Sequence, residues 1–528
     1  MISTIRRGLA ALIAIAAICA PAARAADWIE AQSAHFTIYS QAPEKKTRLY
    51  VRKLEAFHTL TNMLLGASDN GPQTRFTVYL LADNDQMLLV RPNFARQVGG
   101  VYFNCAEGTQ AYASLQYFDM NDQDPSLVTL LHEYSHYVMF QHARTWYPAW
   151  YVEGFAEYLS TADPEKGSIT VGEMSQERDF TLSQDRWIAF DKVLDPDFGF
   201  AGDKSNNPWE IESFYAQSWL LTHYMLSDDG RARALNAYFA RLQNGEAPVA
   251  AFEAATGIKV ATLESTLKRY AQKTFYLKVP VPDYPDDQIA VTPVSPADAA
   301  WLFDASLLTT CPDATQGKAI LWRLTALDTP QASVGLRLAV DRARILYGDG
   351  AAAAADDLKA LTARTPDSFD ANYLLGRAYL KQAQDKSGDE ARALTDQARA
   401  SFIAAYRLKK LDAPNLYFLA GSFSDQPGFP DMNVVNAANG AHVLAPGVLD
   451  YAGMAAFADL INGRRDAAVA ALEPFIGDPH NRQQAERIKN TVDAIRAGKT
   501  TPEIMRIMNS NGPEPTTPTL PEKPKDRK

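Results

Sequence analysis

The amino-acid sequence predicts an α+β domain, made of a small mixed sheet and helices, followed by an all-α domain of helical repeats. Short β-rich runs alternate with helical periodicity between residues 26 and 121, and residues 127–277 are mostly helical in pattern. A proline-spaced segment over residues 278–300 indicates a stiff linker, and an alanine-rich helical region follows it over residues 301–500. A chain of 528 residues with 47% hydrophobic side chains is long enough for two or three such domains.

The first 25 residues have the pattern of a secretory signal peptide. Arg6 and Arg7 give a positive start, residues 8–20 are apolar, and Ala23-Arg24-Ala25 matches the small-residue cleavage pattern. The apolar run is too short for a transmembrane helix with ordinary flanks. We therefore expect cleavage after Ala25 and a bacterial protein that is periplasmic or secreted, with an uncleaved anchor as the alternative.

Charge and cysteine content limit the classes of partner. The formal net charge of the whole chain is −10, and the signal carries three of its arginines, so the mature chain is more acidic still. This balance argues against nucleic acid and anionic membranes as partners. Two cysteines, Cys105 and Cys311, follow the cleavage site. They fall in different predicted domains, so a disulfide and a pair of free thiols are both open.

The predicted α+β domain, residues 26–277, begins with three candidate strands and one helix. Residues 35–39, 75–81 and 111–117 are β-rich or alternate between apolar and polar side chains. Residues 46–65 have helical periodicity. Together these segments predict a small mixed sheet that packs against the next helix, whereas residues 163–207, rich in Asp, Gly and Ser, are expected to form a loop.

A helix expected over residues 127–140 carries the sequence His-Glu-Tyr-Ser-His. Asp124 and Pro125 precede it and suit an N-cap followed by proline at the first helical position. At 3.6 residues per turn, His132 and His136 lie one above the other on the same face, so both imidazoles can reach one metal ion. Glu133 lies roughly 100° around the helix from His132, beside the place where a water would bind, and this H-E-x-x-H spacing is typical of zinc enzymes with a glutamate as general base.

Two residues compete for the place of third metal ligand. His142 has the spacing that some zinc enzymes use when a glycine breaks the helix three residues after the second histidine. Met139 stands at that position here, and it has none of glycine's freedom to turn the chain. If the helix continues, His142 points roughly 240° away from His136, so we reject it as a ligand.

The better candidate is Glu153, on a helix that starts near Pro148. Glu153 and Glu157 share one face at a spacing of four residues, where two like charges destabilise an isolated helix. The pair is explained if Glu153 binds the metal while Glu157 accepts a hydrogen bond from a ligand histidine and fixes its tautomer. A solvated acidic face is the alternative, but the surrounding aromatic residues favour burial.

The two motifs together resemble the gluzincin metallopeptidases, the thermolysin-like clan, and most of all its bacterial peptidase MA-like group. The resemblance lies in His-Glu-Tyr-Ser-His at 132–136 and in Trp-Tyr-Val-Glu-Gly-Phe-Ala-Glu-Tyr at 150–158. It implies one Zn²⁺ per chain on His132, His136 and Glu153, with Glu133 as the catalytic base and Glu157 supporting a ligand. The loop between the two motifs is shorter than in thermolysin, so the shape of the substrate site cannot be transferred.

Two further segments match the substrate site of that clan. Tyr215 occupies the position of a tyrosine that donates to the oxyanion in related enzymes, with a core tyrosine as the alternative. Residues Gly99, Gly100, Val101 and Tyr102 resemble the strand above the zinc, whose edge can pair with a substrate backbone. Related aminopeptidases have a glutamate in this stretch. Its absence before Asn104 favours an endopeptidase, and a plain hairpin is the alternative.

The alanine-rich region resembles the tetratricopeptide repeats, with a plain helical bundle as the alternative. The matching positions are Ala354, Leu358, Leu361 and Pro366, then Leu375, Gly376 and Tyr379, then Ala398, Phe402 and Ala405, and finally Ala468, Leu472 and Pro479. Stacked repeats would offer a concave surface to a protein partner. Residues 501–528 are rich in Pro, Lys and Glu and are expected to be disordered.

These patterns predict an exported, zinc-dependent endopeptidase that acts on a peptide or protein substrate. The competing prediction is a periplasmic scaffold without enzymatic activity, in which the repeats and a peptidase-like module bind protein partners.

Overall fold

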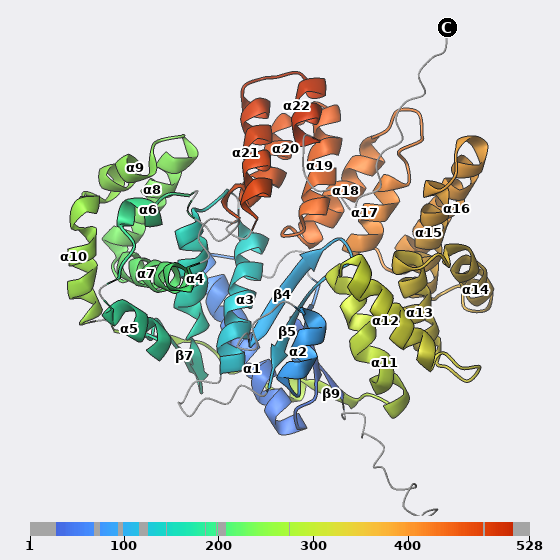
Figure 1. Cartoon of the computed structure of the whole chain (residues 1–528), viewed down its shortest axis with the longest axis horizontal. Coiled ribbons are helices and arrows are strands. Elements are labelled where there is room, and N and C mark those ends of the chain that lie inside the picture. The colour runs from blue at the N-terminus through green and yellow to red at the C-terminus, as the bar shows by residue number, and fades with distance from the viewer. Residues whose placement is uncertain are drawn as a thin grey trace, which may run out of the picture.

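The computed structural model describes residues 28–67, 74–92, 99–115, 125–143, 145–184, 186–196, 198, 207–273, 275–478 and 481–509 (Figure 1). The predicted signal peptide, Asp124, Pro479 and residues 510–528 of the predicted tail lie outside this part. The chain is mixed α+β, with a small mixed sheet and many helices, as the sequence predicts. Among the described residues, none of the helices combines the length and the apolar character that a membrane span requires.

A six-stranded mixed sheet lies in the first half of the chain, in the order β4-β5-β3-β2-β1-β9. Its strands are β1 (Ile29–Gln32), β2 (Phe36–Ser40), β3 (Phe76–Leu81), β4 (Gly100–Cys105), β5 (Gly108–Ser114) and β9 (Ala290–Pro293). Strands β2, β3 and β5 run parallel, whereas β1, β4 and β9 pair antiparallel with their neighbours. The three predicted strands correspond to β2, β3 and β5. Strand β4 is an edge strand, and within the described residues its outer edge pairs with no other strand.

Helices cover both faces of the sheet, which explains why its central strands are apolar on both sides. In β3, Val78 belongs to the core shared with α1 (Glu44–Leu65) and α3 (Pro125–His142). The adjacent Tyr79 and Leu81 belong to a second core on the opposite face. That second core is completed by α2 (Asn84–Val90), α11 (Pro296–Leu307), α12 (Ala314–Leu327) and α13 (Val334–Tyr347). The helical region therefore begins by covering the sheet.

The segment predicted to be a loop, residues 163–207, contains regular structure between residues 163 and 193, so the prediction is wrong there, while residues 185, 197 and 199–206 lie outside the described part. It forms β6 (Asp163–Glu165), β7 (Ser168–Val171), α5 (Gln176–Ser183) and α6 (Phe190–Val193). These elements are too short to show a clear period in the sequence. They pack beside α4 (Ala149–Ser160), α7 (Pro208–Leu226), α8 (Asp229–Gln243), α9 (Pro248–Thr256) and α10 (Val260–Ala271).

The predicted proline-rich linker, residues 278–300, is also built into the fold. Strand β8 (Leu277–Pro280) pairs with β7 in a three-stranded sheet, and β9 pairs with β1 in the six-stranded sheet. Both are edge strands, where a proline without an N–H leaves no ladder bond unmade. The prolines therefore mark sheet edges here, and the segment joins the two sheets.

The second half of the chain is an array of helices that curves around the turn between β4 and β5 (Figure 1). After α13 come α14 (Ala351–Arg364), α15 (Phe369–Gln384), α16 (Gly388–Leu408), α17 (Ala413–Gly421), α18 (Met432–Leu444), α19 (Leu449–Ile461), α20 (Arg465–Leu472), α21 (Arg482–Arg496) and α22 (Thr501–Met508). A Cβ on Gly376 would lie 2.6 Å from the Phe402 ring, so a glycine lets α15 and α16 pack closely.

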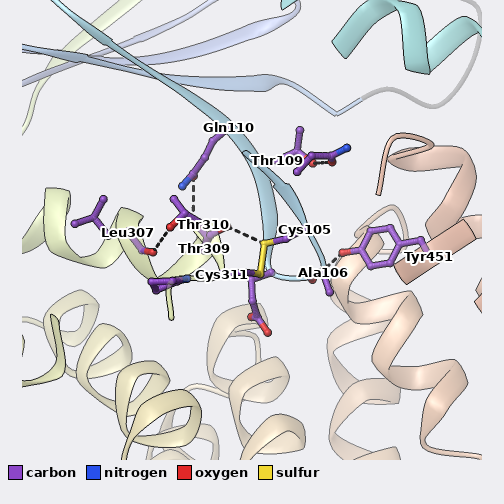
Figure 2. Close-up of a disulfide and its surroundings, with 12 residues drawn as sticks. Cys105, Ala106, Thr109, Gln110, Leu307, Thr309, Thr310, Cys311 and Tyr451 are labelled. Atoms are coloured by element: carbon purple, nitrogen blue, oxygen red, sulfur yellow. Dashed lines mark hydrogen bonds between the residues drawn. A yellow bond between two sulfur atoms is a disulfide. The ribbon is translucent and has the colours of Figure 1, made fainter. Parts of the chain in front are cut away.

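The structure answers one question that the sequence left open and corrects one prediction. Cys105 and Cys311 form a disulfide (Figure 2). The tail was predicted to be disordered from residue 501, but residues 501–508 form α22. A capping box between Thr500 and Glu503 starts this helix, and Ile504 is fully buried in an apolar cluster. One cap and one buried anchor are enough to order a short helix against an existing core.

The crossing of α4 and α7 depends on a glycine, and we expect Gly154→Ala to be strongly destabilising. A Cβ on Gly154 would lie 2.3 Å from Thr222 Oγ1 and 2.4 Å from the Ser218 carbonyl oxygen. Overpacking of this kind costs about 1–3 kcal/mol, and more where backbone must move. The matched control is Gly453→Ala in α19, where a Cβ meets nothing within 4 Å; it should stabilise by about 0.5–1 kcal/mol through helix propensity. Urea unfolding of both variants measures the difference, and equal midpoints would contradict it.

Candidate metal centre

Two consecutive helices place the candidate ligands side by side. Helix α3 carries His132, Glu133 and His136, and α4 carries Glu153 and Glu157. Apolar residues on the remaining faces of α3 and α4 belong to the same core, which fixes the rotation of both helices. As a result the polar positions of α3 and α4 face each other.

Three ligand atoms converge to a triangle of the size that a tetrahedral ion requires. The Nε2 atoms of His132 and His136 are 3.1 Å apart, and each lies 3.6 Å from Oε2 of Glu153. Ligand bonds of roughly 2.0–2.1 Å in a tetrahedral zinc site separate neighbouring ligand atoms by about 3.3 Å. Helix α3 continues through Met139 to its end at His142, and His142 is not part of the group.

The side chains of the three candidate ligands differ in burial. The Glu153 side chain is fully buried, and that of His136 is 8% exposed. The His132 side chain is 15% exposed, the most of the three. Three candidate protein ligands are the number that catalytic zinc sites use, whereas structural zinc sites close four.

Glu157 orients His132 and is itself held by an arginine. Its Oε1 lies 3.3 Å from His132 Nδ1, which leaves Nε2 of that ring facing the ligand triangle. Arg178, on α5, donates from Nε and Nη2 to the two oxygens of Glu157 at 2.8 and 3.0 Å. Its Nη1 donates to Glu212 at 2.6 Å. Such a bidentate pair fixes the carboxylate in place.

The electrostatic balance of the group favours a cation. Burial alone would lower the pKa of His132, but the carboxylates of Glu153 and Glu157 outweigh it and raise the pKa to about 10. Burial likewise raises the pKa of Glu157, yet Arg178 and His132 outweigh it and bring the pKa down to about 2. Glu157 is therefore an anion at every physiological pH. The carboxylates near the triangle outnumber the one arginine, Arg178, so they stabilise a positive charge there.

Glu133 and Tyr215 lie next to the ligand group without belonging to it. The Tyr215 ring centroid is 6.3 Å from that of His132, and the Arg178 guanidinium lies 5.3 Å from the Tyr215 ring centroid. Burial, and then repulsion from neighbouring carboxylates including Glu133, raises the pKa of Tyr215 well above its usual value. Its hydroxyl therefore keeps its proton and can act as a hydrogen-bond donor.

Strand β4 passes along α3 beside the ligand group. A Cβ on Gly100 would lie 3.0 Å from Thr129 Cγ2, so this glycine lets the strand approach α3 one turn before His132. Tyr102 packs on Tyr137 at 6.1 Å between ring centroids. Burial, and then repulsion from Tyr137 and Glu133, raises the pKa of Tyr102 well above its usual value, which places it near that carboxylate.

The four residues predicted to bind substrate have different surroundings. The Gly99 carbonyl accepts a hydrogen bond from the Ser114 N–H at 2.8 Å. The Val101 side chain belongs to the core on the far face of the sheet, so its side chain faces away from the ligand group. Along α3, residues 99–102 therefore expose the backbone of β4 and the Tyr102 ring.

The sequence interpretation missed Arg178, because residues 163–207 were taken for a loop, and it missed Glu212, which lies on α7 and meets the group only through Arg178. A helix-start signal was present: Ser175 accepts a hydrogen bond from the Arg178 N–H at 3.2 Å and caps α5. That signal places a helix at residue 176. The contact of Arg178 with Glu157 depends on how α5 packs against α7, and spacing along the chain does not show it.

In comparisons with known proteins, no family model matches this chain, and neither a curated protein nor a solved structure matches it. The function must therefore be inferred from the chemistry of this group of residues. Its three ligand atoms, with a neighbouring glutamate and tyrosine, form the group on which that argument rests.

Proposed function

We propose that the protein is a zinc-dependent peptidase, an exported endopeptidase of gluzincin type that hydrolyses peptide bonds in a peptide or protein substrate. The observation that carries the proposal is the convergence of His132, His136 and Glu153, with Glu133 next to His132 in the chain and close enough to raise the pKa of that imidazole. Two imidazoles and one carboxylate are the donor set of the catalytic zinc sites in thermolysin-like enzymes. The spacing of their ligand atoms fits the ion. When bound, zinc would polarise the peptide carbonyl and lower the pKa of water to about 7.

The chain's own residues would share the remaining work. Glu133 would take the proton from the attacking water and pass it to the leaving amine, as a general base and then a general acid. Tyr215 would donate its hydroxyl hydrogen to the oxygen that becomes negative, and a preorganised donor of this kind contributes about 3–4 kcal/mol. Glu157, held by Arg178, would keep His132 in the tautomer that presents Nε2. The outer edge of β4 would pair with the substrate backbone.

Other features support the remaining parts of the proposal. The Cys105–Cys311 disulfide suits an oxidising compartment, as the predicted signal peptide requires. The close approach of α15 and α16 at Gly376 suits helical repeats of tetratricopeptide type. The competing function is a periplasmic scaffold, which the length of the helical array from α11 to α22 favours.

Metal analysis combined with a protease assay separates the two functions. We expect the mature protein to contain about one zinc per chain and to cleave unfolded casein, and we expect a chelator to abolish cleavage until zinc is restored. Elemental analysis and peptide release measure these effects. A protein that binds no metal and leaves casein intact would be a scaffold.

A further inference from the structure

The hairpin formed by β4 and β5 connects the metal centre to the helical array. Strand β5 pairs with β3 only over Gln110–Ser114, whereas the β4–β5 pairing continues to Cys105 and Gly108. The tip of the hairpin therefore extends beyond the body of the sheet. A two-stranded hairpin is marginally stable by itself, so the tip needs support from elsewhere.

An acidic residue at the tip provides the first support. Glu107 accepts hydrogen bonds from Nη1 and Nη2 of Arg377, on α15, at 2.9 and 2.7 Å, and it lies 3.6 Å from Nη1 of Arg342, on α13. The Glu107 and Arg377 side chains are 10% and 11% exposed. The Arg377 guanidinium also lies 3.6 Å from the ring centroid of Phe418, on α17. Three helices of the array thus form a carboxylate-binding pocket that the hairpin fills.

Further contacts surround the ion pair. Cys105 is bonded to Cys311, and the Tyr451 hydroxyl donates to the Ala106 carbonyl oxygen at 2.9 Å (Figure 2). The Asn104 side-chain amide donates to the Gly447 carbonyl oxygen, in the turn between α18 and α19. The tip therefore contacts the array at three places: Cys311 after α11, Arg377 on α15 and Tyr451 on α19.

The opposite end of the same strand packs against α3, one turn before His132. From Cys105, β4 runs back over five residues to Gly100, which packs on Thr129 of α3. A short, hydrogen-bonded strand transmits a displacement of one end to the other, because its pairing with β5 fixes the register throughout. The position of the outer edge of β4 is therefore determined at both ends.

We propose that the helical array acts as a built-in brace for β4, and that Glu107 and Arg377 are positioning residues for the substrate-binding edge of the peptidase. In this arrangement the inner surface of the array binds a segment of its own chain. This inference rests on the role of β4 in the proposed function. The array would support the strand that binds substrate, and the residues that bind zinc would come from α3 and α4.

The test compares amide hydrogen exchange in three perturbed forms of the full-length, metal-loaded protein. Glu107→Gln removes the buried charge, Tyr451→Phe removes only the hydroxyl, and mild reduction of the wild type opens the disulfide. The matched control is Glu390→Gln, at an exposed ion pair with Lys386 on the array. We expect the Val101 and Phe103 amides, which face β5, to exchange at least fivefold faster in the perturbed forms, while those of α3 and the zinc content stay unchanged. If Glu107→Gln fails to fold, the other two forms decide.

Kinetics provide a readout that a purely structural role would not move. For peptide hydrolysis we expect KM to rise at least fivefold in Glu107→Gln with kcat changed less than twofold, and Glu107→Asp to recover part of the loss. Unchanged exchange in β4, or a loss of kcat alone, would overturn the proposal. If the wild type cleaves no peptide, the proposed function fails, and the exchange comparison still decides whether the array braces the strand.

Discussion

Replacement of Glu133 by glutamine in the proposed peptidase is expected to abolish peptide hydrolysis without loss of zinc. Glu133 lies beside the ligand triangle but is not one of its three members, so the amide should leave zinc binding intact. A glutamine cannot accept a proton, and loss of a general base costs roughly 10²–10⁴-fold in rate. Elemental analysis and hydrolysis of an unfolded protein substrate measure the two properties on the same sample.

The control for this experiment is Glu173→Gln, an equally conservative change at an exposed side chain. It should leave both rate and metal content unaltered. Full hydrolysis by the Glu133 variant would remove this residue from the mechanism. Loss of zinc together with activity would instead make it a residue of the metal site.

Replacement of Glu153 by glutamine is expected to abolish the stabilisation that zinc gives to the fold. A ligand that binds only the folded state stabilises it by about 4 kcal/mol when present at 1,000 times its Kd. The candidate group found among the described residues has two imidazoles and one carboxylate, and Glu153 supplies the carboxylate. Its side chain is fully buried. A neutral amide of the same size should preserve packing and still remove most of the affinity for the ion.

A graded comparison makes the Glu153 experiment specific. Glu157→Gln changes a residue that touches a ligand histidine rather than the ion, so it should lower zinc affinity by about 10–100-fold without abolishing binding. Thermal unfolding with and without zinc ranks the three proteins. If zinc raises the unfolding temperature of the Glu153 variant as much as that of the wild type, Glu153 is not a ligand.

The sequence could predict that His132, His136 and Glu153 lie together, because their geometry is local. His132 and His136 are related by one helical turn, and the next helix along the chain supplies Glu153, so spacing alone brings them near one another. The contact between Arg178 and Glu157 depends on the packing of α5. The bond between Cys105 and Cys311 crosses a predicted domain boundary, which left their pairing open.

Proline was the main source of error in the fold. The segment from residue 278 to 300 has the composition of a linker, because edge strands and linkers share the same tolerance for proline. Only the pairing of β8 with β7 and of β9 with β1 distinguishes the two cases, and those partners lie more than a hundred residues earlier in the chain. The packing of α11, α12 and α13 on the second face of the sheet was missed for the same reason. A linker at residues 278–300 would have separated these helices from the sheet.

The face of the sheet that packs on α11 carries a row of stacked tyrosine rings, which limits where the chain can be cut. Tyr39, Tyr79 and Tyr112 stack across three neighbouring strands with 5.1 Å between successive ring centroids, and the Tyr112 hydroxyl donates to Ser306 on α11. A fragment ending before α11 would leave this ladder in water, a surface of the kind that makes truncated proteins aggregate. The two halves should therefore be expressed and engineered as one folding unit, and a recombinant fragment that ends at residue 295 is expected to be insoluble.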